Sequence, residues 1–310
     1  MLKDYIRIAR PDHWFKNVFI LPGTLMAWLA DPDGNLWTRL VLLFWAVMAT
    51  NLVASSNYTI NELLDADEDK KHPDKKNRPA ALGRIRSSIA LIEWLLLAVT
   101  GLAVSWFIHP MFFATQCVLW LQGIFYNVKP FRTKDVPYLD VLSESINNPI
   151  RFLLGWYAIR TGMIPPISLI FAYWMLGAYF MAVKRFAELR YIGSSKTAGV
   201  YRKSFLYYTE ERLMNSIVFY ATASALFGGI FLMRYKIELI LSVPFIAGFM
   251  SYYMKLGFMK DSPAQHPEKL YRQVVFILYA VMTTSIVIFC LFVKIPWIQK
   301  AFQSTVPGGF

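Results

Sequence analysis

Charged residues are scarce in this sequence, and the short motifs that mark common soluble enzymes are missing. Asp, Glu, Lys and Arg make up 17% of its 310 residues, whereas about a quarter of a typical soluble domain is charged. The chain contains no Walker loop, no glycine-rich dinucleotide turn, no Cys/His zinc spacing and no nucleophile elbow. These absences argue against P-loop hydrolases, Rossmann dehydrogenases, zinc enzymes and serine hydrolases.

Cysteine is nearly absent as well. Cys117 and Cys290 are the only two, and both lie inside apolar runs, where a cysteine behaves as a small hydrophobic residue rather than as part of a disulfide or metal site. The first five residues lack the charged-then-apolar pattern of a cleavable signal peptide.

Apolar residues are abundant: 56% of the chain is hydrophobic and 16% is aromatic. They recur in runs of about 17 to 25 residues, the length that crosses a bilayer as a helix. We therefore predict an all-α, polytopic membrane protein with one domain over residues 1–310. It has about nine spans, at roughly 15–31, 40–60, 87–107, 111–127, 139–159, 165–185, 213–233, 237–255 and 272–293.

The net charge of +12 fits basic loops that face anionic lipid headgroups, and a phosphate-rich substrate would be a second reason. The cations are spread over many loops, so nucleic acid is not an expected partner. Alternate sides of the predicted spans carry 25 and six Lys and Arg residues. This bias places the N-terminus and the motif loops, at about 61–86, 127–138 and 184–212, in the cytoplasm.

The densest polar cluster follows the second predicted span. Asn61, Asp65 and Asp69 are spaced by four residues, which on a helix is a drift of only about 40° per step, so they share one face. Such oxygen ligands suit Mg²⁺, which commonly binds one or two carboxylates together with substrate phosphates. An ordinary charged loop is the alternative, but the fixed spacing and the following cations, up to Arg78, favour a metal site.

The first predicted span opens with Arg10, Trp14, Lys16 and Asn17. An interfacial anchor and a direct phosphate contact by Lys16 are both consistent with this segment. In the loop at 126–135, Pro130 ends the preceding helix. Arg132 and Lys134 would then project from an extended segment toward one anion, although the positive-inside bias alone would also explain two cations.

The fifth predicted span contains Glu144, Asn147, Asn148 and Arg151 at spacings of three to four residues, with Pro149 between them. Ionisable groups inside a span usually face a cavity or a partner. The stripe is either a clamp between Glu144 and Arg151 or a set of substrate contacts. Both interpretations imply a water-accessible cavity in the cytoplasmic half of the bundle.

The sixth predicted span ends with Lys184 and Glu188, one helical turn apart. They form either an intrahelical ion pair or a site where Lys184 binds diphosphate and Glu188 binds a metal or a sugar hydroxyl. Residues 191–212, which include Lys196, Arg202 and Lys203, are predicted to form a mobile amphipathic cap.

The spacing of Asn61, Asp65 and Asp69, with Tyr126 and the Pro130-x-Arg132-x-Lys134 run, resembles the UbiA superfamily of intramembrane prenyltransferases. This resemblance implies nine transmembrane helices around a central cavity that opens to one membrane face. It also implies that Mg²⁺ and Asp-rich motifs bind a prenyl diphosphate.

Two features differ from the usual family pattern. Glu62 stands where the first motif normally has Asp, and the second Asp-rich motif is replaced by Lys184-Arg185-Phe186-Ala187-Glu188-Leu189. That segment, His72-Pro73-x-Lys75-Lys76-x-Arg78-Pro79 and the Arg10–Asn17 segment are similar to the decaprenyl-phosphate phosphoribosyltransferase branch. The resemblance implies transfer of 5-phosphoribose from phosphoribosyl diphosphate to a polyprenyl phosphate in a bacterial inner or cell membrane.

The resemblance also implies roles for individual residues. The expected Mg²⁺ ligands are Asn61, Glu62, Asp65 and Asp69, and the expected catalytic residues are Asp65, Asp69, Lys134 and Glu188. The expected substrate contacts are Lys16, Asn17, Asn61, Lys75, Lys76, Arg78, Tyr126, Arg132, Asn147, Arg151, Lys184 and Arg185.

Two other functions remain open at this point. The same fold could transfer a prenyl group to an aromatic or other hydrophobic acceptor, but the missing second Asp motif argues against it. A transporter or lipid-binding scaffold would show interrupted helices in two corresponding halves, whereas the sequence shows one interruption, at Pro149. Membrane lipid is an expected partner, and a homo-oligomer is possible.

Overall fold

All regular structure in the described part of the chain is helical. The computed structural model describes residues 2–72, 75–159, 162–265, 270 and 272–302. Arg160 and Pro73, which the sequence analysis used, lie outside these ranges. The elements are α1 (Leu2–Ile8), η1 (Pro11–Ile20), α2 (Leu21–Ala30), α3 (Leu36–Leu64), α4 (Ala66–Asp69), η2 (Lys75–Asn77), α5 (Ser87–Ile108), α6 (Pro110–Asn127), η3 (Thr133–Asp135), α7 (Leu139–Ser145), α8 (Asn147–Ala158), α9 (Ile167–Ile192), α10 (Ser195–Gly199), η4 (Lys203–Leu206), α11 (Glu210–Tyr235), η5 (Ile237–Ser242), α12 (Val243–Gly257), η6 (Pro263–Gln265), α13 (Val274–Phe292) and α14 (Pro296–Ala301).

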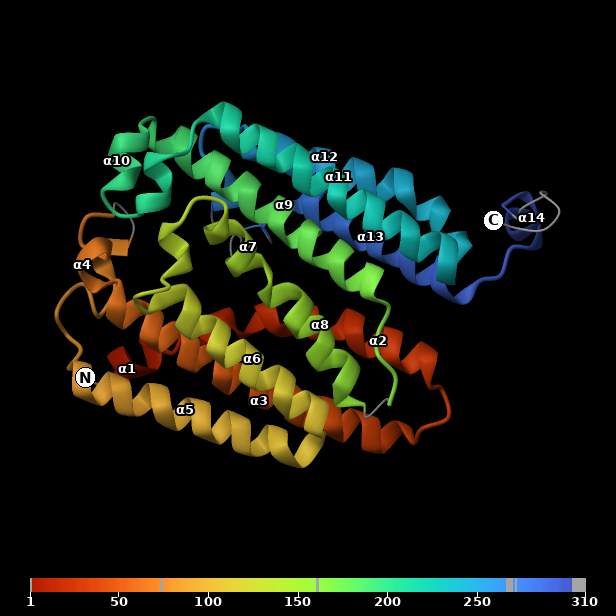
Figure 1. Ribbon diagram of the computed structural model, residues 1–310, viewed down its shortest axis with the longest axis horizontal. Helices are drawn as coiled ribbons and strands as arrows, with labels where there is room; N and C mark the ends of the chain where they lie inside the picture. Colours follow the sequence, from red (N-terminus) through yellow and green to blue (C-terminus); the bar gives the residue numbers. More distant parts are fainter. Residues whose placement is uncertain (1, 73–74, 160–161, 266–269, 271, 303–310) are drawn as a thin grey trace.

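The helices form two packed groups (Figure 1). In the first, α3 packs against α5 and α6, and α2 packs against α8. In the second, α9 packs against α11, α12 and α7. Small residues allow close approach within the first group: a Cβ added at Gly101 of α5 would lie 2.9 Å from the Ala49 carbonyl oxygen of α3. Membrane helices commonly associate through such small residues.

Six helical segments are long and apolar enough to cross a membrane. They are α3, α5, α9, α11, the η5–α12 segment and α13. The predicted count of nine is therefore not confirmed by the described residues. The predicted span 15–31 is divided between η1 and α2, and the predicted span 139–159 is divided between α7 and α8, which meet at Ile146.

The break between α7 and α8 explains how Pro149 is accommodated. Pro149 is the third residue of α8, and the first turn of a helix tolerates proline because the amide hydrogens there have no intrahelical acceptor. The predicted polar stripe consequently lies on two helices rather than one, with Glu144 on α7 and Arg151 on α8.

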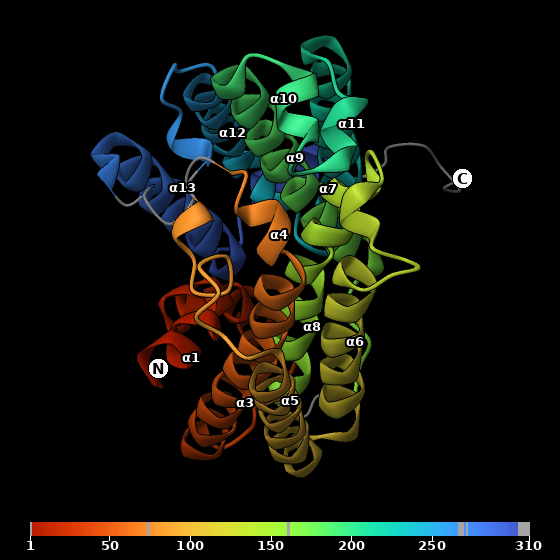
Figure 2. The ribbon, with the colours of Figure 1, turned by 90° about the vertical axis from the view of Figure 1, so that its left-hand side faces the viewer.

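The motif segments gather at one end of the bundle. Figure 2 looks onto this end, where α4 lies between the two helix groups and α10 belongs to the segment above it. Helix α14 lies at the opposite end (Figure 1). Segments that are separated by more than a hundred residues in the sequence therefore meet at one face of the protein.

Candidate active site

A polar pocket lies where the first motif, the η3 loop and the α10–η4 segment meet. Its lining residues are Asp65, Glu68, Asp69, Lys75, Arg132, Lys134, Asp135, Tyr201 and Arg202. The lining thus contains four carboxylates and four cations, so its formal charge is balanced. A balanced set of this kind can take up a cation and an anion together, because each incoming charge finds groups of the opposite sign.

Asp65 is the centre of the pocket's hydrogen-bond network. It ends α3, and its Oδ1 accepts hydrogen bonds from Lys134 Nζ and from Arg132 Nη2, the latter at 3.0 Å. Its Oδ2 accepts a hydrogen bond of 3.2 Å from Asn61 Nδ2. Burial would raise the pKa of Asp65, but Lys134 and Arg132 outweigh burial and hold it below its ordinary value.

Asn127 connects the first motif to the η3 loop. Its Oδ1 accepts hydrogen bonds from Asn61 Nδ2 at 2.5 Å and from Lys134 Nζ at 2.8 Å. Burial lowers the pKa of Lys134 to about 8, although Asp65 favours the charged form. Asn127, the last residue of α6 and 3% exposed, was not among the predicted site residues.

The backbone of the loop that contains η3 differs from the extended conformation that we expected. Arg132 has φ of 28° and is followed by the 3₁₀ helix η3, so the chain turns back sharply after Phe131. This turn brings Arg132 and Lys134 to the same carboxylate. The expectation that both cations point to one anion is consistent with this geometry, but the expected backbone conformation was wrong.

Asp69 lies in the same pocket on α4. It is 5% exposed, and its Oδ2 accepts a hydrogen bond of 2.5 Å from Arg78 Nη1. Lys75 lines the pocket beside the ring of Tyr201, with Nζ 5.8 Å from the ring centroid. Burial lowers the pKa of Lys75 to about 7. Lys76, by contrast, is exposed.

The segment 194–208 covers one side of the pocket and contributes Tyr201 and Arg202 to its lining. Phe205 and Tyr208 have no exposed surface, so the segment is packed onto the bundle by apolar and aromatic side chains. Arg202 was predicted to lie in a cap, but neither Arg202 nor Tyr201 was predicted to be a site residue. Their position depends on contacts with α7 and α9, which the sequence does not reveal.

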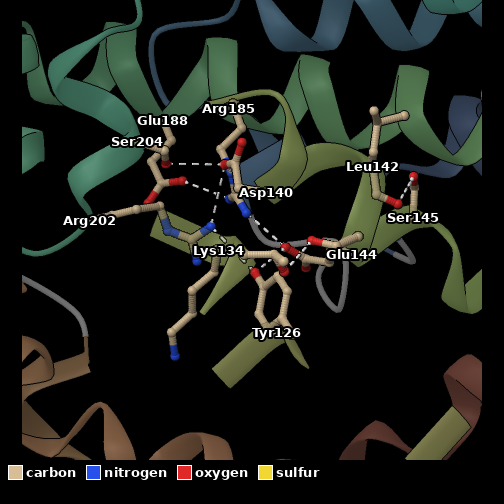
Figure 3. A network of polar contacts seen from close by, with 12 residues as sticks. Tyr126, Lys134, Asp140, Leu142, Glu144, Ser145, Arg185, Glu188, Arg202 and Ser204 are labelled. Atoms are coloured by element: carbon tan, nitrogen blue, oxygen red, sulfur yellow. Dashed lines mark hydrogen bonds and ion pairs between the residues drawn. The ribbon is translucent and has the colours of Figure 1, made fainter. Parts of the chain in front are cut away.

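Arg185 is not part of the pocket lining and lies in the polar network that Figure 3 shows. Its guanidinium group is 2% exposed and pairs with three carboxylates, those of Asp140 at 3.0 Å, Glu144 at 2.7 Å and Glu188 at 3.2 Å. Glu144 also accepts a hydrogen bond of 2.9 Å from the Tyr126 hydroxyl. Arg185 and Tyr126, which we expected to contact substrate, are thus engaged by protein groups.

Two ion pairs that the sequence left open as alternatives do not form. Glu144 pairs with Arg185, while Arg151 donates its hydrogen bonds to Asn17 and to the Asn147 carbonyl. Glu188 pairs with Arg185 instead of Lys184, and it also accepts a hydrogen bond of 3.0 Å from the Tyr201 hydroxyl.

The remaining predicted residues lie outside the pocket lining. Glu62 is 2% exposed, and its carboxylate lies 3.3 Å from Arg10, on another side of α3 from Asp65. Lys16 Nζ lies 3.1 Å from His13 Nδ1. Asn147 donates a hydrogen bond of 3.0 Å to the Glu144 carbonyl. Lys184 is half-buried, and the described residues offer it no ion-pair partner within 4.0 Å.

The fit of Mg²⁺ to this pocket can be judged from its donors. The described residues contain no group of three or more His, Cys, Asp or Glu side chains arranged around one metal position. Asp65 and Asp69 nevertheless present hard carboxylate oxygens to one pocket. Mg²⁺ is usually held by one or two carboxylates, with substrate phosphates and water completing its octahedron. The residues therefore fit a metal that arrives with a phosphate ligand.

Three comparisons with known proteins agree with one another. Residues 18–279 match the model of the UbiA prenyltransferase family. The decaprenyl-phosphate phosphoribosyltransferase of Mycobacterium tuberculosis is 29% identical over 231 residues, which cover 74% of this chain and 74% of that enzyme. Protoheme IX farnesyltransferase 2 of Chromobacterium violaceum is 27% identical over 196 residues, which cover 62% of this chain and 63% of that enzyme. A solved structure of a UbiA homologue from Archaeoglobus fulgidus, bound to GPP and Mg²⁺, has a TM-score of 0.68 at 21% identity and covers 92% of this chain and 99% of that one.

Proposed function

Because the chain belongs to the UbiA prenyltransferase family and is an integral, multi-pass membrane transferase, we propose that it transfers 5-phosphoribose from phosphoribosyl diphosphate to a polyprenyl phosphate. The motifs had predicted this family, and the match over residues 18–279 confirms it. The relatives named decaprenyl-phosphate phosphoribosyltransferase support the choice of donor and acceptor.

The observation that carries the proposal is the arrangement at the end of α9. Glu188 contacts Arg185, Tyr201 and His72, and it has no other acidic residue one turn away with which to hold a second metal. Arg185, three residues before Glu188, is already paired with three carboxylates, whereas the described residues offer Lys184 no ion-pair partner within 4.0 Å. A donor with a 5-phosphate adds an anion rather than a second metal, and the charge of Lys184 suits it.

The chemistry requires little from a general base. In the proposed reaction a phosphate oxygen of the acceptor forms a bond to the anomeric carbon of the sugar, and the carbon–oxygen bond to diphosphate breaks. Diphosphate leaves with the electron pair, and the acceptor phosphate is already an anion at neutral pH. The barrier must therefore be lowered by positioning the reactants and by stabilising charge on the leaving group.

In this proposal Asp65 and Asp69, with Asn61 beside them, hold Mg²⁺ and the diphosphate. Bound Mg²⁺ would neutralise charge that develops on the leaving oxygen. Lys75, Arg132 and Arg202 line the same pocket and would contact phosphate oxygens. The side on which the basic loops lie would be cytoplasmic, because 25 of 31 loop cations are on that side.

A second candidate function is transfer of a prenyl group, because the Archaeoglobus fulgidus homologue is bound to GPP and Mg²⁺. In that case the donor would be a prenyl diphosphate and the acceptor a hydrophobic nucleophile. The decisive experiment offers the purified protein radiolabelled phosphoribosyl diphosphate with a polyprenyl phosphate, or a prenyl diphosphate with aromatic acceptors. Turnover of the first pair, dependent on Mg²⁺, supports the proposal; turnover of the second pair alone overturns it.

A further inference from the structure

Arg151 carries a buried positive charge for which the described residues provide no carboxylate partner. The residue is 8% exposed. Its Nε donates a hydrogen bond of 2.7 Å to Asn17 Oδ1, and its Nη1 donates one of 3.4 Å to the Asn147 carbonyl. A charge inside a membrane protein is costly unless a partner or a ligand compensates for it. Such a residue is a candidate for binding an anion.

The protein fixes the orientation of this guanidinium group. Asn17 Nδ2 donates a hydrogen bond of 2.6 Å to Asn51 Oδ1, so its Oδ1 is directed to Arg151. The three residues come from η1, α3 and α8, and Asn17 and Asn51 are 3% and 5% exposed. Within the described part of the chain, none of these hydrogen bonds involves Nη2 of Arg151.

A second observation points to a ligand at the same place. The hydroxyl of Tyr173 on α9 is buried and has no hydrogen-bond partner among the described residues. It lies within electrostatic range of Arg151, as does the hydroxyl of Tyr58 on α3. A buried hydroxyl without a partner costs free energy, and a bound anion could accept its hydrogen bond. One cation and two hydroxyls thus lie in the same part of the bundle interior.

From these observations, and resting on the proposed function, we propose that Arg151, Tyr58 and Tyr173 bind the phosphate group of the polyprenyl phosphate acceptor. This site is separate from the Asp65 pocket, because none of the three residues is part of that pocket's lining. Tyr58 precedes Asp65 by seven residues on α3, which corresponds to about 10 Å along the helix axis. A ribose ring can lie between an acceptor phosphate near Tyr58 and a diphosphate at Asp65.

The surroundings of Arg151 favour a phosphate that is carried on an apolar chain. The Tyr173 ring packs against Phe152 at 5.7 Å and against Phe19 at 6.3 Å between ring centroids. Phe19 is 40% exposed. The Arg151 site is therefore bordered by aromatic side chains, one of which is partly exposed. A prenyl chain gains free energy from contact with these rings, whereas a soluble sugar phosphate does not.

Direct binding can test this site without turnover. Farnesyl phosphate is the probe, with phosphoribosyl diphosphate as the second ligand and farnesol as a control for the chain alone. Arg151→Met should weaken binding of farnesyl phosphate by roughly ten- to a hundredfold, the usual loss for a charge-assisted contact. It should change binding of phosphoribosyl diphosphate and of farnesol by less than about threefold. Arg190→Met is the matched control, because Arg190 lies on α9 in an exposed pair with Glu210, and should change neither.

Two milder variants keep the test decisive if Arg151→Met does not fold. Arg151→Lys keeps the charge, and Tyr173→Phe removes only the unpartnered hydroxyl. Each variant should weaken binding of farnesyl phosphate more than binding of phosphoribosyl diphosphate. Equal losses for the lipid phosphate and phosphoribosyl diphosphate would assign Arg151 to the donor and overturn the proposal, as would unchanged binding of farnesyl phosphate. If the unmodified protein fails to turn over phosphoribosyl diphosphate yet shows the selective loss, the proposed donor is wrong while the lipid phosphate site stands.

Discussion

Asp140 and Arg185 form an ion pair that solvent cannot reach: Oδ2 and Nε are 3.0 Å apart, and the two side chains are 0% and 2% exposed. Asp140 also accepts hydrogen bonds from Ser204 at 3.2 Å and Tyr208 at 2.5 Å. One carboxylate therefore joins α7, α9 and the segment 194–208 that carries Arg202 into the pocket (Figure 3). Arg202 Nη1 itself lies 3.7 Å from the same carboxylate.

The first prediction is that Asp140 positions Arg202 without contacting substrate. Asp140→Ala should lower the free energy of unfolding by about 3 to 5 kcal/mol, because it leaves Arg185 with a buried charge that is less well compensated. Asp140→Asn keeps a hydrogen-bond acceptor for Ser204 and should retain more stability while raising the KM for the donor. Thermal unfolding in detergent and steady-state kinetics measure the two effects. Asp67→Asn is the control, since Asp67 is exposed beside Lys70; an equal effect there would contradict the prediction.

The second prediction concerns the metal site. Asp65→Asn and Asp69→Asn should each reduce activity by at least a hundredfold, because each removes a ligand of the proposed Mg²⁺–diphosphate complex. Both replacements keep the shape of the side chain, so the membrane protein should remain folded by size-exclusion chromatography. Excess chelator should abolish the activity of the unmodified protein, and added Mg²⁺ should restore it. Full activity in both variants would refute the assignment.

Part of the first motif was predictable because it depends on local helix geometry. Four-residue spacing determines which side chains share a helix face, so Asn61 and Asp65 could be placed together from the sequence. The expected single helix through Asp69 was wrong, because α3 ends at Leu64 and Asp69 lies on the separate helix α4. The apolar runs likewise predicted α3, α5, α11 and α13 to within about four residues, whereas α9 ends at Ile192, seven residues beyond the predicted span. These features depend only on the period of a helix and on the thickness of a bilayer.

Features that depend on contacts between distant segments were not predictable. Glu144 and Arg185 are separated by 41 residues, and the sequence offers nearer partners for each of them. The packing of α7 against α9 brings them together. Asp140 was missed for the same reason, because its importance arises from residues of the segment 194–208 that fold back onto α7.

The third prediction is a pH dependence of donor binding. Burial lowers the pKa of Lys75 to about 7, so in the free protein its ammonium form is lost as pH rises through 7. Phosphate binds the ammonium form, and affinity for phosphoribosyl diphosphate should therefore fall between pH 7 and 9, by up to about tenfold per pH unit. Binding at pH 8 should be accompanied by proton uptake, which calorimetry in buffers of different ionisation enthalpy measures. Lys75→Met should bind more weakly at pH 6 and lose the part of this dependence near pH 7, while Lys134, whose pKa is about 8, should retain the part near pH 8; an unchanged slope near pH 7 would exclude Lys75 as its source.

The fourth prediction concerns orientation in the membrane. Single cysteines at Lys76 and Lys129, in a background where Cys117 and Cys290 are replaced by alanine, should react with an impermeant reagent only from the cytoplasmic side. Both positions are exposed, whereas Lys134 is 3% exposed and would react poorly from either side. A cysteine at Asp33 is the control, because it lies at the other end of α3, and it should react from outside intact cells. The reverse pattern would overturn the orientation that the loop charges predict.

The last prediction separates the two candidate donors through Lys184. This residue is half-buried on α9, and the described residues offer it no ion-pair partner within 4.0 Å, so its charge is available to a ligand. A phosphoribosyl donor carries a 5-phosphate that free diphosphate lacks. Lys184→Ala should therefore weaken binding of phosphoribosyl diphosphate by roughly ten- to a hundredfold. It should weaken binding of free diphosphate far less. Arg190→Ala, two turns further along α9, is the control for loss of a cation from this helix. Equal losses for both ligands would move Lys184 to the diphosphate end of the site, and tight Mg²⁺-dependent binding of a prenyl diphosphate, with none of phosphoribosyl diphosphate, would establish the other donor.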